Sequence, residues 1–505
     1  MIRTVHAEEA PVILAIAVSR PGLPRVGSGS GSKAPAVGGE GMTQPAPLAK
    51  PTASLIDLIG RTPMVEITQM DTGPCRLFLK LESQNPGGSI KDRIGLSMIA
   101  AAEKSGALKP GGTIVEATAG NTGLGLAQVA AAKGYKLILV VPDKMSREKI
   151  QHLRALGADV RLTRSDVGKG HAEYYQDMAE RLAIENQAHY INQFANPANP
   201  HAHETTTGPE IWEQTEHDVD AVVVGVGSGG TLSGLGRFFA RVSPKTEMVL
   251  ADPKGSVLTP LIKTGKMIEA GSWTVEGIGE DFVPPNADLS LVKAAYTIPD
   301  KESIETARAL LSKEGILAGS SSGTLLAAAL RYCREQTTPK RVVTLVPDNG
   351  NKYLSKVFND YWVIEQGLST KPLKGDLSDL ISRRFDTGAT VTVGPQDTIL
   401  TAYNRMRAAD VSQLPVVDEG NLIGIMDESD ILAKVEGPED TRHARFTALV
   451  KDAMTPAPKT LEVSSPISAL VPIFHENEVA LVCDHGKFVG LITRIDLINH
   501  IRLRT

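Results

Sequence analysis

Short runs of consecutive apolar residues alternate with amphipathic stretches through much of the chain. The runs Lys136–Val141, Ala221–Val224 and Val342–Val346 have the length of strands and carry no polar side. Strands that are apolar on both sides belong in parallel sheets with helices on both faces. Between them, Ser146–Leu156 and Glu302–Lys313 have the apolar spacing of helices. The pattern therefore predicts an α/β region with mostly parallel sheets, with ligands at the carboxyl ends of the strands.

A second pattern repeats near the C-terminus. The segment Gly424–Ile431 resembles Gly490–Leu497, and each copy follows a β-rich stretch, Leu414–Val417 or Val479–Val482. Each unit is about half of a small domain, so the two units are expected to pack as a pseudo-symmetric α+β pair.

These patterns divide the chain into five parts. Residues 1–48 are rich in Gly, Ser, Pro and Ala, which predicts a disordered tail. The α/β region covers residues 49–364, a linker covers 365–376, and the two repeats cover 377–436 and 447–505. Because folded-looking sequence begins soon after Met42, this methionine is a candidate for an alternative start of translation.

Composition narrows the class of partner and the compartment. The chain has 505 residues and a net charge of −5 without a large basic block, which disfavours a nucleic-acid partner. No apolar stretch approaches the ~20 residues of a membrane span, so no membrane association is expected. Cys75, Cys333 and Cys483 are scattered and show no metal-ligand spacing. They predict small core residues in a reducing compartment, the cytoplasm.

Lys91 is the first candidate for chemistry. It follows Gly87-Gly88-Ser89-Ile90 and precedes an apolar helical run. The positive end of a helix and partial burial both favour the neutral amine, which is the form that attacks a carbonyl group. A lysine in this position is also commonly a solvated residue at a helix start. The other loops of the chain are needed to distinguish the two interpretations.

Three turns rich in small residues lie downstream between an apolar run and a helix. Thr118–Gly123 is suited to an anion such as an amino-acid carboxylate, and Gly225–Thr231 forms a glycine-rich phosphate cradle. Gly319–Gly323 carries three serines, whose hydroxyls can meet a heterocycle nitrogen or simply cap the helix.

The glycine-rich turn also has a rival interpretation. Gly225, Gly227 and Gly230 satisfy the dinucleotide pattern G-x-G-x-x-G, and Asp252 ends the next strand where a ribose-binding acid is placed. A nicotinamide dehydrogenase would leave Lys91 and the Asn121 turn unexplained. His201 and His203 lie in a Pro/Asn-rich loop without a further ligand, so no metal site is expected.

The four loops in this order resemble the fold-type II β-family of pyridoxal phosphate (PLP) enzymes, the cysteine synthase and cystathionine β-synthase group. The resemblance covers about residues 54–364 and also rests on Lys144–Lys149, Glu276–Gly279 and Lys352–Lys356. The C-terminal repeats resemble a Bateman module, a tandem pair of CBS domains. The resemblance implies two α/β subdomains with mostly parallel sheets, followed by a paired α+β module.

The resemblance also assigns roles residue by residue. Lys91 matches the lysine that carries the cofactor and acts as the base, Asn121 the residue at its 3′ oxygen, and Ser321 the partner of its pyridine nitrogen. The phosphate loop corresponds to Gly227, Ser228, Gly229, Gly230 and Thr231. The substrate-carboxylate loop corresponds to Thr118, Gly120, Asn121 and Thr122.

Three departures from the family pattern bear on these roles. Ala119 replaces a serine of the carboxylate loop, and Glu280 replaces the tyrosine that follows Gly-Ile-Gly in eukaryotic members. The haem-binding Cys/His segment of animal members is not recognisable, so no haem is expected.

The resemblance implies condensation of L-serine with L-homocysteine by β-replacement, in a homodimer or homotetramer. It implies an S-adenosylmethionine or adenine-nucleotide effector, with Thr493, Asp496 and Asp430 as candidate contacts; in the first repeat Asp427 replaces the hydroxyl of Thr493. The paired repeats could instead dimerise without a ligand. The alternatives for the whole chain are a cysteine synthase that uses O-acetylserine and sulfide, and a nucleotide-sensing protein whose enzyme domain is inactive.

Overall fold

The structure is a computed structural model that describes residues 51–502, except for residues 119, 144, 146, 169, 369–373, 382, 457 and 477. The predicted tail and residues 369–373 of the predicted linker therefore lie outside the described residues. So does Ala119 in the predicted carboxylate loop.

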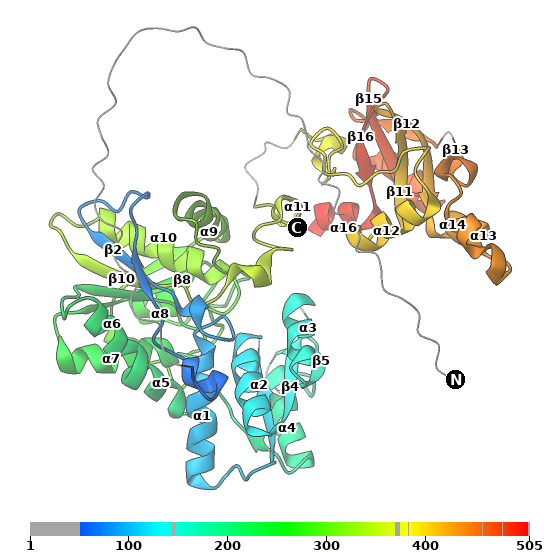
Figure 1. The fold of residues 1–505 in the computed structure, drawn as a ribbon. Coiled ribbons are helices and arrows are strands. Elements are labelled where there is room, and N and C mark those ends of the chain that lie inside the picture. The colour runs from blue at the N-terminus through cyan, green and yellow to red at the C-terminus, as the bar shows by residue number, and fades with distance from the viewer. Residues whose placement is uncertain are drawn as a thin grey trace, which may run out of the picture. The chain divides into compact units, whose positions relative to one another are not determined.

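The α/β region contains two mostly parallel sheets, which confirms the predicted fold class (Figure 1). In the larger sheet only β1 runs antiparallel to its neighbour. The order of the larger sheet is β1 (Met64–Glu66), β2 (Arg76–Lys80), β10 (Arg341–Leu345), β7 (Ala221–Val224), β8 (Glu247–Pro253) and β9 (Val292–Ile298). The smaller sheet is entirely parallel, with the order β5 (Asp159–Thr163), β4 (Lys136–Pro142), β3 (Thr113–Ala117) and β6 (His189–Tyr190).

Helices connect the strands of both sheets. Two large apolar cores form, one on the larger sheet and one on the smaller sheet. The helices are α1 (Lys91–Ser105), α2 (Asn121–Lys133), α3 (Arg147–Ala155), α4 (Tyr175–Glu185), α5 (Ala198–Ala202), α6 (Gly208–Gln214), α7 (Gly230–Val242), α8 (Leu258–Thr264), α9 (Asp300–Glu314), α10 (Ser320–Arg334) and α11 (Asp360–Glu365).

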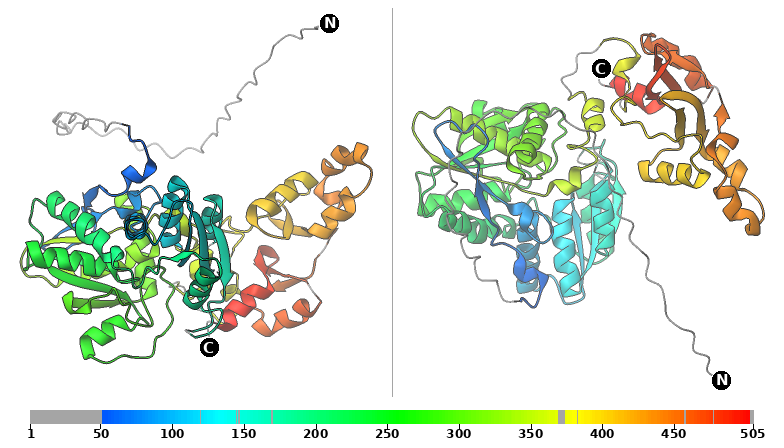
Figure 2. Two further views of the ribbon diagram at one scale, coloured as in Figure 1. Left: turned by 90° about the horizontal axis from the view of Figure 1, so that it is seen from below. Right: turned by 45° about the horizontal axis from the view of Figure 1, so that its top comes forward.

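Helices α1 and α2 lie side by side and approach each other backbone to backbone (Figures 1 and 2). A Cβ atom on Gly95 would lie 2.7 Å from the backbone of Gly125, and a Cβ on Gly125 would lie 2.6 Å from the carbonyl oxygen of Lys91. Larger side chains would therefore force the helices apart. This close contact holds the start of α1, with Lys91, near the start of α2, with Asn121.

The C-terminal pair shows the predicted pseudo-symmetry. One sheet contains β11 (Gln413–Asp418), β12 (Asn421–Asp427) and β13 (Thr455–Pro456), and the other contains β14 (Thr460–Glu462), β15 (Ala480–Asp484) and β16 (Lys487–Ile492). The two sheets meet at β12 and β16 (Figure 2). The helices of this pair are α12 (Ile399–Ala409), α13 (Glu428–Val435), α14 (Arg442–Phe446), α15 (Leu470–His475) and α16 (Arg494–Arg502). In the first unit a parallel bridge from Val393 to Val416 takes the place of the β14–β15 pairing.

Two local expectations were wrong. The segment with His201 and His203 is helical rather than a loop, because α5 continues into a π-helical turn (His203–Thr207). Helix α10 begins at Ser320, inside the Gly319–Gly323 turn that was expected to precede the helix, so the serines form its first helical turn. No described helix has the length and apolar character needed to cross a bilayer.

Candidate active site

A cavity of about 740 Å³ lies in the α/β region, where the N-termini of α1, α2, α7 and α10 converge. The structure brings every predicted cofactor and substrate residue to this one cavity. The lining includes Lys91, Thr118, Gly120, Asn121, Thr122, Gly227, Ser228, Gly229, Gly230, Thr231 and Ser321.

Lys91 is the first residue of α1 and is half-buried in the cavity wall. Burial lowers the pKa of its amine to about 8, although the carboxylates of Glu280 and Asp348 act in the opposite direction. A sizeable fraction of the amine is therefore neutral near pH 8, as attack on an aldehyde requires.

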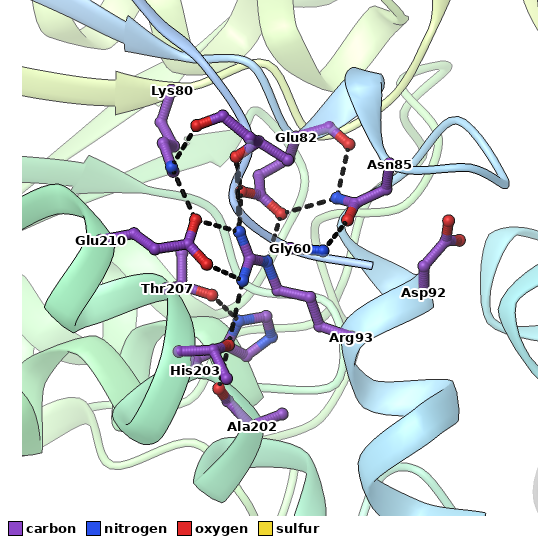
Figure 3. Close-up of polar contacts among 12 residues, drawn as sticks. Gly60, Lys80, Glu82, Asn85, Asp92, Arg93, Ala202, His203, Thr207 and Glu210 are labelled. Atoms are coloured by element: carbon purple, nitrogen blue, oxygen red, sulfur yellow. Dashed lines mark hydrogen bonds and ion pairs between the residues drawn. The ribbon is translucent and has the colours of Figure 1, made fainter. Parts of the chain in front are cut away.

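A buried ion network is centred on Arg93, two residues after Lys91 on the same helix (Figure 3). The guanidinium of Arg93 donates to both oxygens of Glu82 at 2.7 and 2.8 Å and to both oxygens of Glu210 at 2.7 Å. The Nζ of Lys80 donates to Glu210 at 2.8 Å. Each buried charge thus has a partner of opposite charge, and the network ties the first turn of α1 to β2 and α6.

Asn121 is held at both ends of its side-chain amide. Its Nδ2 donates to Oδ2 of Asp348 at 2.7 Å, and its Oδ1 accepts from Nζ of Lys352 at 3.0 Å. Tyr353 also donates to Oδ2 of Asp348, at 2.7 Å. Among the described residues Nδ2 has no second acceptor, so its other N–H can meet an oxygen of a ligand.

The glycine-rich turn has the properties of a phosphate site. Within the described part of the chain, the backbone N–H groups of Gly227, Ser228 and Gly229 donate to no protein acceptor. They precede α7, whose N-terminus attracts an anion. Gly229 has φ +85°, and a Cβ there would lie 2.6 Å from the backbone of Ala287. A side chain at this position is therefore excluded by both conformation and space.

His203 supports the same turn and was missed as such by the sequence analysis. It is fully buried, its Nδ1 contacts Thr207 Oγ1 at 3.0 Å, and its Nε2 contacts Thr231 Oγ1 at 3.3 Å. Burial lowers its pKa well below the usual value. It therefore orients Thr231 as a neutral ring that has one donor and one acceptor nitrogen.

The hydroxyls of the predicted carboxylate loop are partly engaged within the protein. Thr118 Oγ1 accepts from the N–H groups of Gly120 and Gly123, and Thr122 Oγ1 donates to Gln193 at 2.6 Å. Ser321 is buried at the cavity wall in the first turn of α10. The threonines thus shape the loop, and backbone N–H groups remain as carboxylate donors.

These residues fit PLP. An amine of lowered pKa suits the aldehyde, unpaired backbone donors at a helix start suit the phosphate, and an amide N–H suits the phenolic oxygen. The hydroxyl of Ser321, a neutral group, suits the pyridine nitrogen.

The dinucleotide interpretation fails at Asp252. This carboxylate is buried and accepts from the backbone N–H of Thr259 at 2.8 Å, so it caps α8. It does not line the cavity. Among the described residues, no group of three or more His, Cys, Asp or Glu side chains is arranged to hold a metal ion.

The candidate effector residues lie at equivalent helix starts in the two C-terminal units. Asp496 Oδ2 accepts from both the backbone N–H and the hydroxyl of Thr493, at 2.7 and 2.5 Å. Asp430 and Asp427 form a reciprocal capping box at the start of α13. Both pairs stabilise a helix N-terminus, whether or not a ligand also uses them.

Comparison with protein families agrees with this geometry. The model described as "Pyridoxal-phosphate dependent enzyme" matches residues 55–348, and the CBS domain model matches residues 377–437 and 450–503. Cystathionine β-synthase of Apis mellifera is 34% identical over 88% of this chain and 90% of its own length. The enzyme of Oryctolagus cuniculus is 37% identical over 91% of this chain and 87% of its own length.

Relatives that match only the α/β region are similar to it as well. Cysteine synthase A of Escherichia coli strain K12 is 46% identical over 59% of this chain and 92% of its own length. The solved structure of a hydrogen sulfide-producing enzyme from Fusobacterium nucleatum has a TM-score of 0.56 and 39% identity. It covers 60% of this chain and 100% of that enzyme. Because the cystathionine β-synthases match across both parts of the chain, the protein is a PLP-dependent lyase of the cystathionine β-synthase family.

Proposed function

We propose that the protein condenses L-serine with L-homocysteine to form L-cystathionine by β-replacement. The observation that carries the proposal is that one cavity gathers Lys91, Asn121, the 227–231 turn and Ser321 from four separate segments. A nicotinamide dehydrogenase would use only the 227–231 turn, whereas a PLP-dependent β-replacement uses all four. The relatives that share the C-terminal pair are named cystathionine β-synthases, which favours homocysteine as the second substrate.

Each residue of the cavity has a role that follows from its chemistry. PLP, when bound, supplies the electron sink that makes the α-proton of serine acidic and lets the β-hydroxyl leave. Lys91 Nζ holds the cofactor, and as a free amine it takes the α-proton and later returns a proton to the same carbon. Its lowered pKa keeps a useful fraction of the amine in the form that accepts a proton.

The other residues bind and orient. The backbone N–H groups of the 227–231 turn hold the phosphate. In the 118–122 loop the N–H groups of Thr118 and Gly120 already donate within the protein, so those of Asn121 and Thr122 hold the serine carboxylate. The hydroxyl of Ser321 contacts the pyridine nitrogen without adding a charge. This limits how strongly negative charge is drawn into the ring and disfavours side reactions such as transamination.

A second candidate is a cysteine synthase that uses O-acetylserine and sulfide. The 46% identity to the cysteine synthase A of Escherichia coli supports it. Product analysis separates the two. Purified protein is given serine with homocysteine, or O-acetylserine with sulfide, and cystathionine and cysteine are quantified. Cystathionine as the faster product supports the proposal; cysteine formation alone refutes it.

The spectrum of the purified protein tests the cofactor directly. The proposal requires a yellow protein, and borohydride followed by peptide mapping should label Lys91. A colourless protein that binds adenine nucleotides would support the alternative of an inactive enzyme domain. The same spectrum tests the expectation that haem is absent.

We further propose that the C-terminal pair binds an adenosyl ligand, S-adenosylmethionine or an adenine nucleotide. Thr493 with Asp496, and Asp430 in the other unit, place oxygen acceptors at a helix start where a ribose could be held. Calorimetry with each compound tests this, and no heat with any of them would leave a ligand-free dimerisation module. We place the protein in the cytoplasm as a homodimer or homotetramer, which light scattering tests. Its three buried, unpaired cysteines support a reducing compartment.

A further inference from the structure

A cluster of three charged side chains lies on the cavity wall and is not used in the roles above. Lys149, Glu276 and Lys356 all line the cavity that contains Lys91. Glu276 Oε2 lies 2.6 Å from Nζ of Lys149, and Oε1 lies 2.7 Å from Nζ of Lys356. One carboxylate thus separates two ammonium groups, and the cluster carries a net charge of about +1.

The cluster is built into the fold, because each side chain is well buried. Side-chain exposure is 2% for Lys149, 10% for Glu276 and 22% for Lys356. Burial raises the pKa of Glu276, but the charges of Lys149 and Lys356 outweigh this effect and hold the pKa below its ordinary value. Lys356 is the most accessible member, so a ligand in the cavity would meet it first.

Two contacts place the cluster against the loops that bind the first substrate and the cofactor. The alkyl chain of Lys149 lies against Gly120, since a Cβ on that glycine would be 2.8 Å from Cδ of the lysine. The backbone N–H of Glu276 donates to Ser320 Oγ at 3.1 Å, beside Ser321. The charges therefore border the predicted reaction centre on two sides.

We infer that this cluster is the binding site for the amino-acid end of the thiol substrate, with Lys356 on its carboxylate and Glu276 on its ammonium. The inference rests on the proposed β-replacement and names the residues that select the second substrate. An α-amino acid carries one carboxylate and one ammonium group. Lys356 and Glu276 lie side by side and carry the opposite charges, so each can pair with one end of the amino acid. Sulfide has no such end, so a sulfide-using enzyme needs no buried charges here. Glu276 can balance only one of the two ammonium groups, so the buried cluster keeps an excess positive charge that a substrate carboxylate would balance.

The test compares two thiols that differ in their charged end. Homocysteine has a carboxylate and an ammonium, whereas 2-mercaptoethanol has neither. The variant Lys356→Met removes one ammonium but leaves Glu276 paired with Lys149, so no charge is left alone. We expect the ratio of kcat/KM for homocysteine to kcat/KM for 2-mercaptoethanol to fall about tenfold or more, the effect of losing one charge-assisted hydrogen bond. Lys356→Arg should restore most of the ratio.

Matched controls distinguish a role of Lys356 in binding the thiol from a role in protein stability. Lys293→Met changes an exposed lysine on β9 and should leave the ratio unchanged. Thermal unfolding of each variant reports any loss of stability, which would affect both thiols alike. A ratio within about twofold of the unmodified protein for Lys356→Met would overturn the inference.

The choice of first substrate separates this inference from the proposed function. Each thiol is assayed with serine and, separately, with O-acetylserine. If serine gives no product, the proposed function fails, while the comparison of thiols with O-acetylserine still decides the role of the cluster.

Discussion

The amide oxygen of Asn121 accepts a hydrogen bond from Nζ of Lys352 at 3.0 Å. An ammonium group can only donate, so this contact fixes which end of the amide is oxygen. The amide nitrogen must then face Asp348, to which it donates at 2.7 Å. The lysine therefore determines the direction in which Asn121 presents its remaining N–H group.

The first prediction follows from this contact. Lys352→Met should weaken PLP binding about tenfold, because the Asn121 amide loses the partner that holds its oxygen and can rotate. Fluorescence titration of the cofactor-free protein with PLP measures the affinity. Lys293→Met is the matched control, as it removes an exposed lysine of β9. Equal affinities for all three proteins would contradict the role given to Lys352.

The second prediction concerns the rate at which PLP is taken up. Burial lowers the pKa of Lys91 to about 8, so the neutral amine is abundant above that pH and scarce below it. The rate of colour formation after PLP is added to cofactor-free protein should therefore rise with pH, with a midpoint near 8. An exposed model amine such as Nα-acetyl-lysine, followed in parallel, should show the ordinary midpoint of about 10.4.

A variant of Glu280 tests the direction in which this carboxylate shifts the pKa of Lys91. The carboxylate of Glu280 raises the pKa of Lys91 because it stabilises the ammonium form. Glu280→Gln should therefore move the midpoint to lower pH and speed colour formation at pH 7. A midpoint that moves upward, or stays in place, would show that Glu280 does not act on Lys91.

Much of this site could be predicted from sequence because its parts are local. A lysine after glycines, and small-residue turns between an apolar run and a helix, are each readable within about ten residues. Parallel packing places helix N-termini at the carboxyl edge of each sheet, so the turn after β3 with Asn121 and the turn after β7 with Gly227 could each be expected to bind a ligand.

The remaining parts depend on contacts between distant segments. Lys149 and Glu276 are 127 residues apart, and Asn121 and Lys352 are 231 apart. The sequence around each of these residues does not indicate which lysine is buried or which residue it contacts. His203 was considered only as a metal ligand in a loop and was set aside, because its local sequence does not reveal the π-helical turn that directs it toward Thr231. Asp252 matches a dinucleotide motif in the sequence, but in the structure its carboxylate accepts a capping hydrogen bond from the N–H of Thr259.

The third prediction concerns the ion network behind Lys91. Arg93→Met should reduce the free energy of unfolding by about 3–5 kcal/mol, because it leaves the carboxylates of Glu82 and Glu210 buried without their main partner. Arg76→Met is the matched control, since the Arg76–Glu66 pair is exposed to solvent and is expected to contribute little to stability. Denaturant titration of both variants gives the comparison, and similar losses would contradict the importance of burial.

The fourth prediction is a pH dependence of stability from Glu116. Burial raises the pKa of this carboxyl to about 8, although hydrogen bonds such as the long one of 3.4 Å from the N–H of Gln193 to Oε1 act in the opposite direction. Because this value lies above the ordinary 4.5, folding takes up a proton between the two values. The stability contribution of Glu116 is therefore complete below about pH 4.5 and is lost as pH rises to about 8.

A neutral isostere should remove this dependence. Glu116→Gln should have a higher Tm than the unmodified protein above pH 8, with little difference near pH 5, where Glu116 is largely protonated in the folded protein. Thermal unfolding across this range measures the effect. The exposed Glu269→Gln serves as control and should leave the pH profile unchanged. A Glu116→Gln curve parallel to that of the unmodified protein would show that the carboxyl is ionised in the folded state.

The fifth prediction concerns Ser321, which lies buried at the cavity wall. Ser321→Asp should place a carboxylate beside the pyridine nitrogen of bound PLP and hold a proton on it, which makes the ring a stronger electron sink. New long-wavelength absorbance on addition of serine, together with slower cystathionine formation, is the expected result. Ser321→Ala removes the hydroxyl without adding charge and should slow the reaction without the new absorbance. If the spectrum and rate of the Asp variant match those of the unmodified protein, Ser321 does not contact the nitrogen, and the orientation of the cofactor in the cavity must be revised.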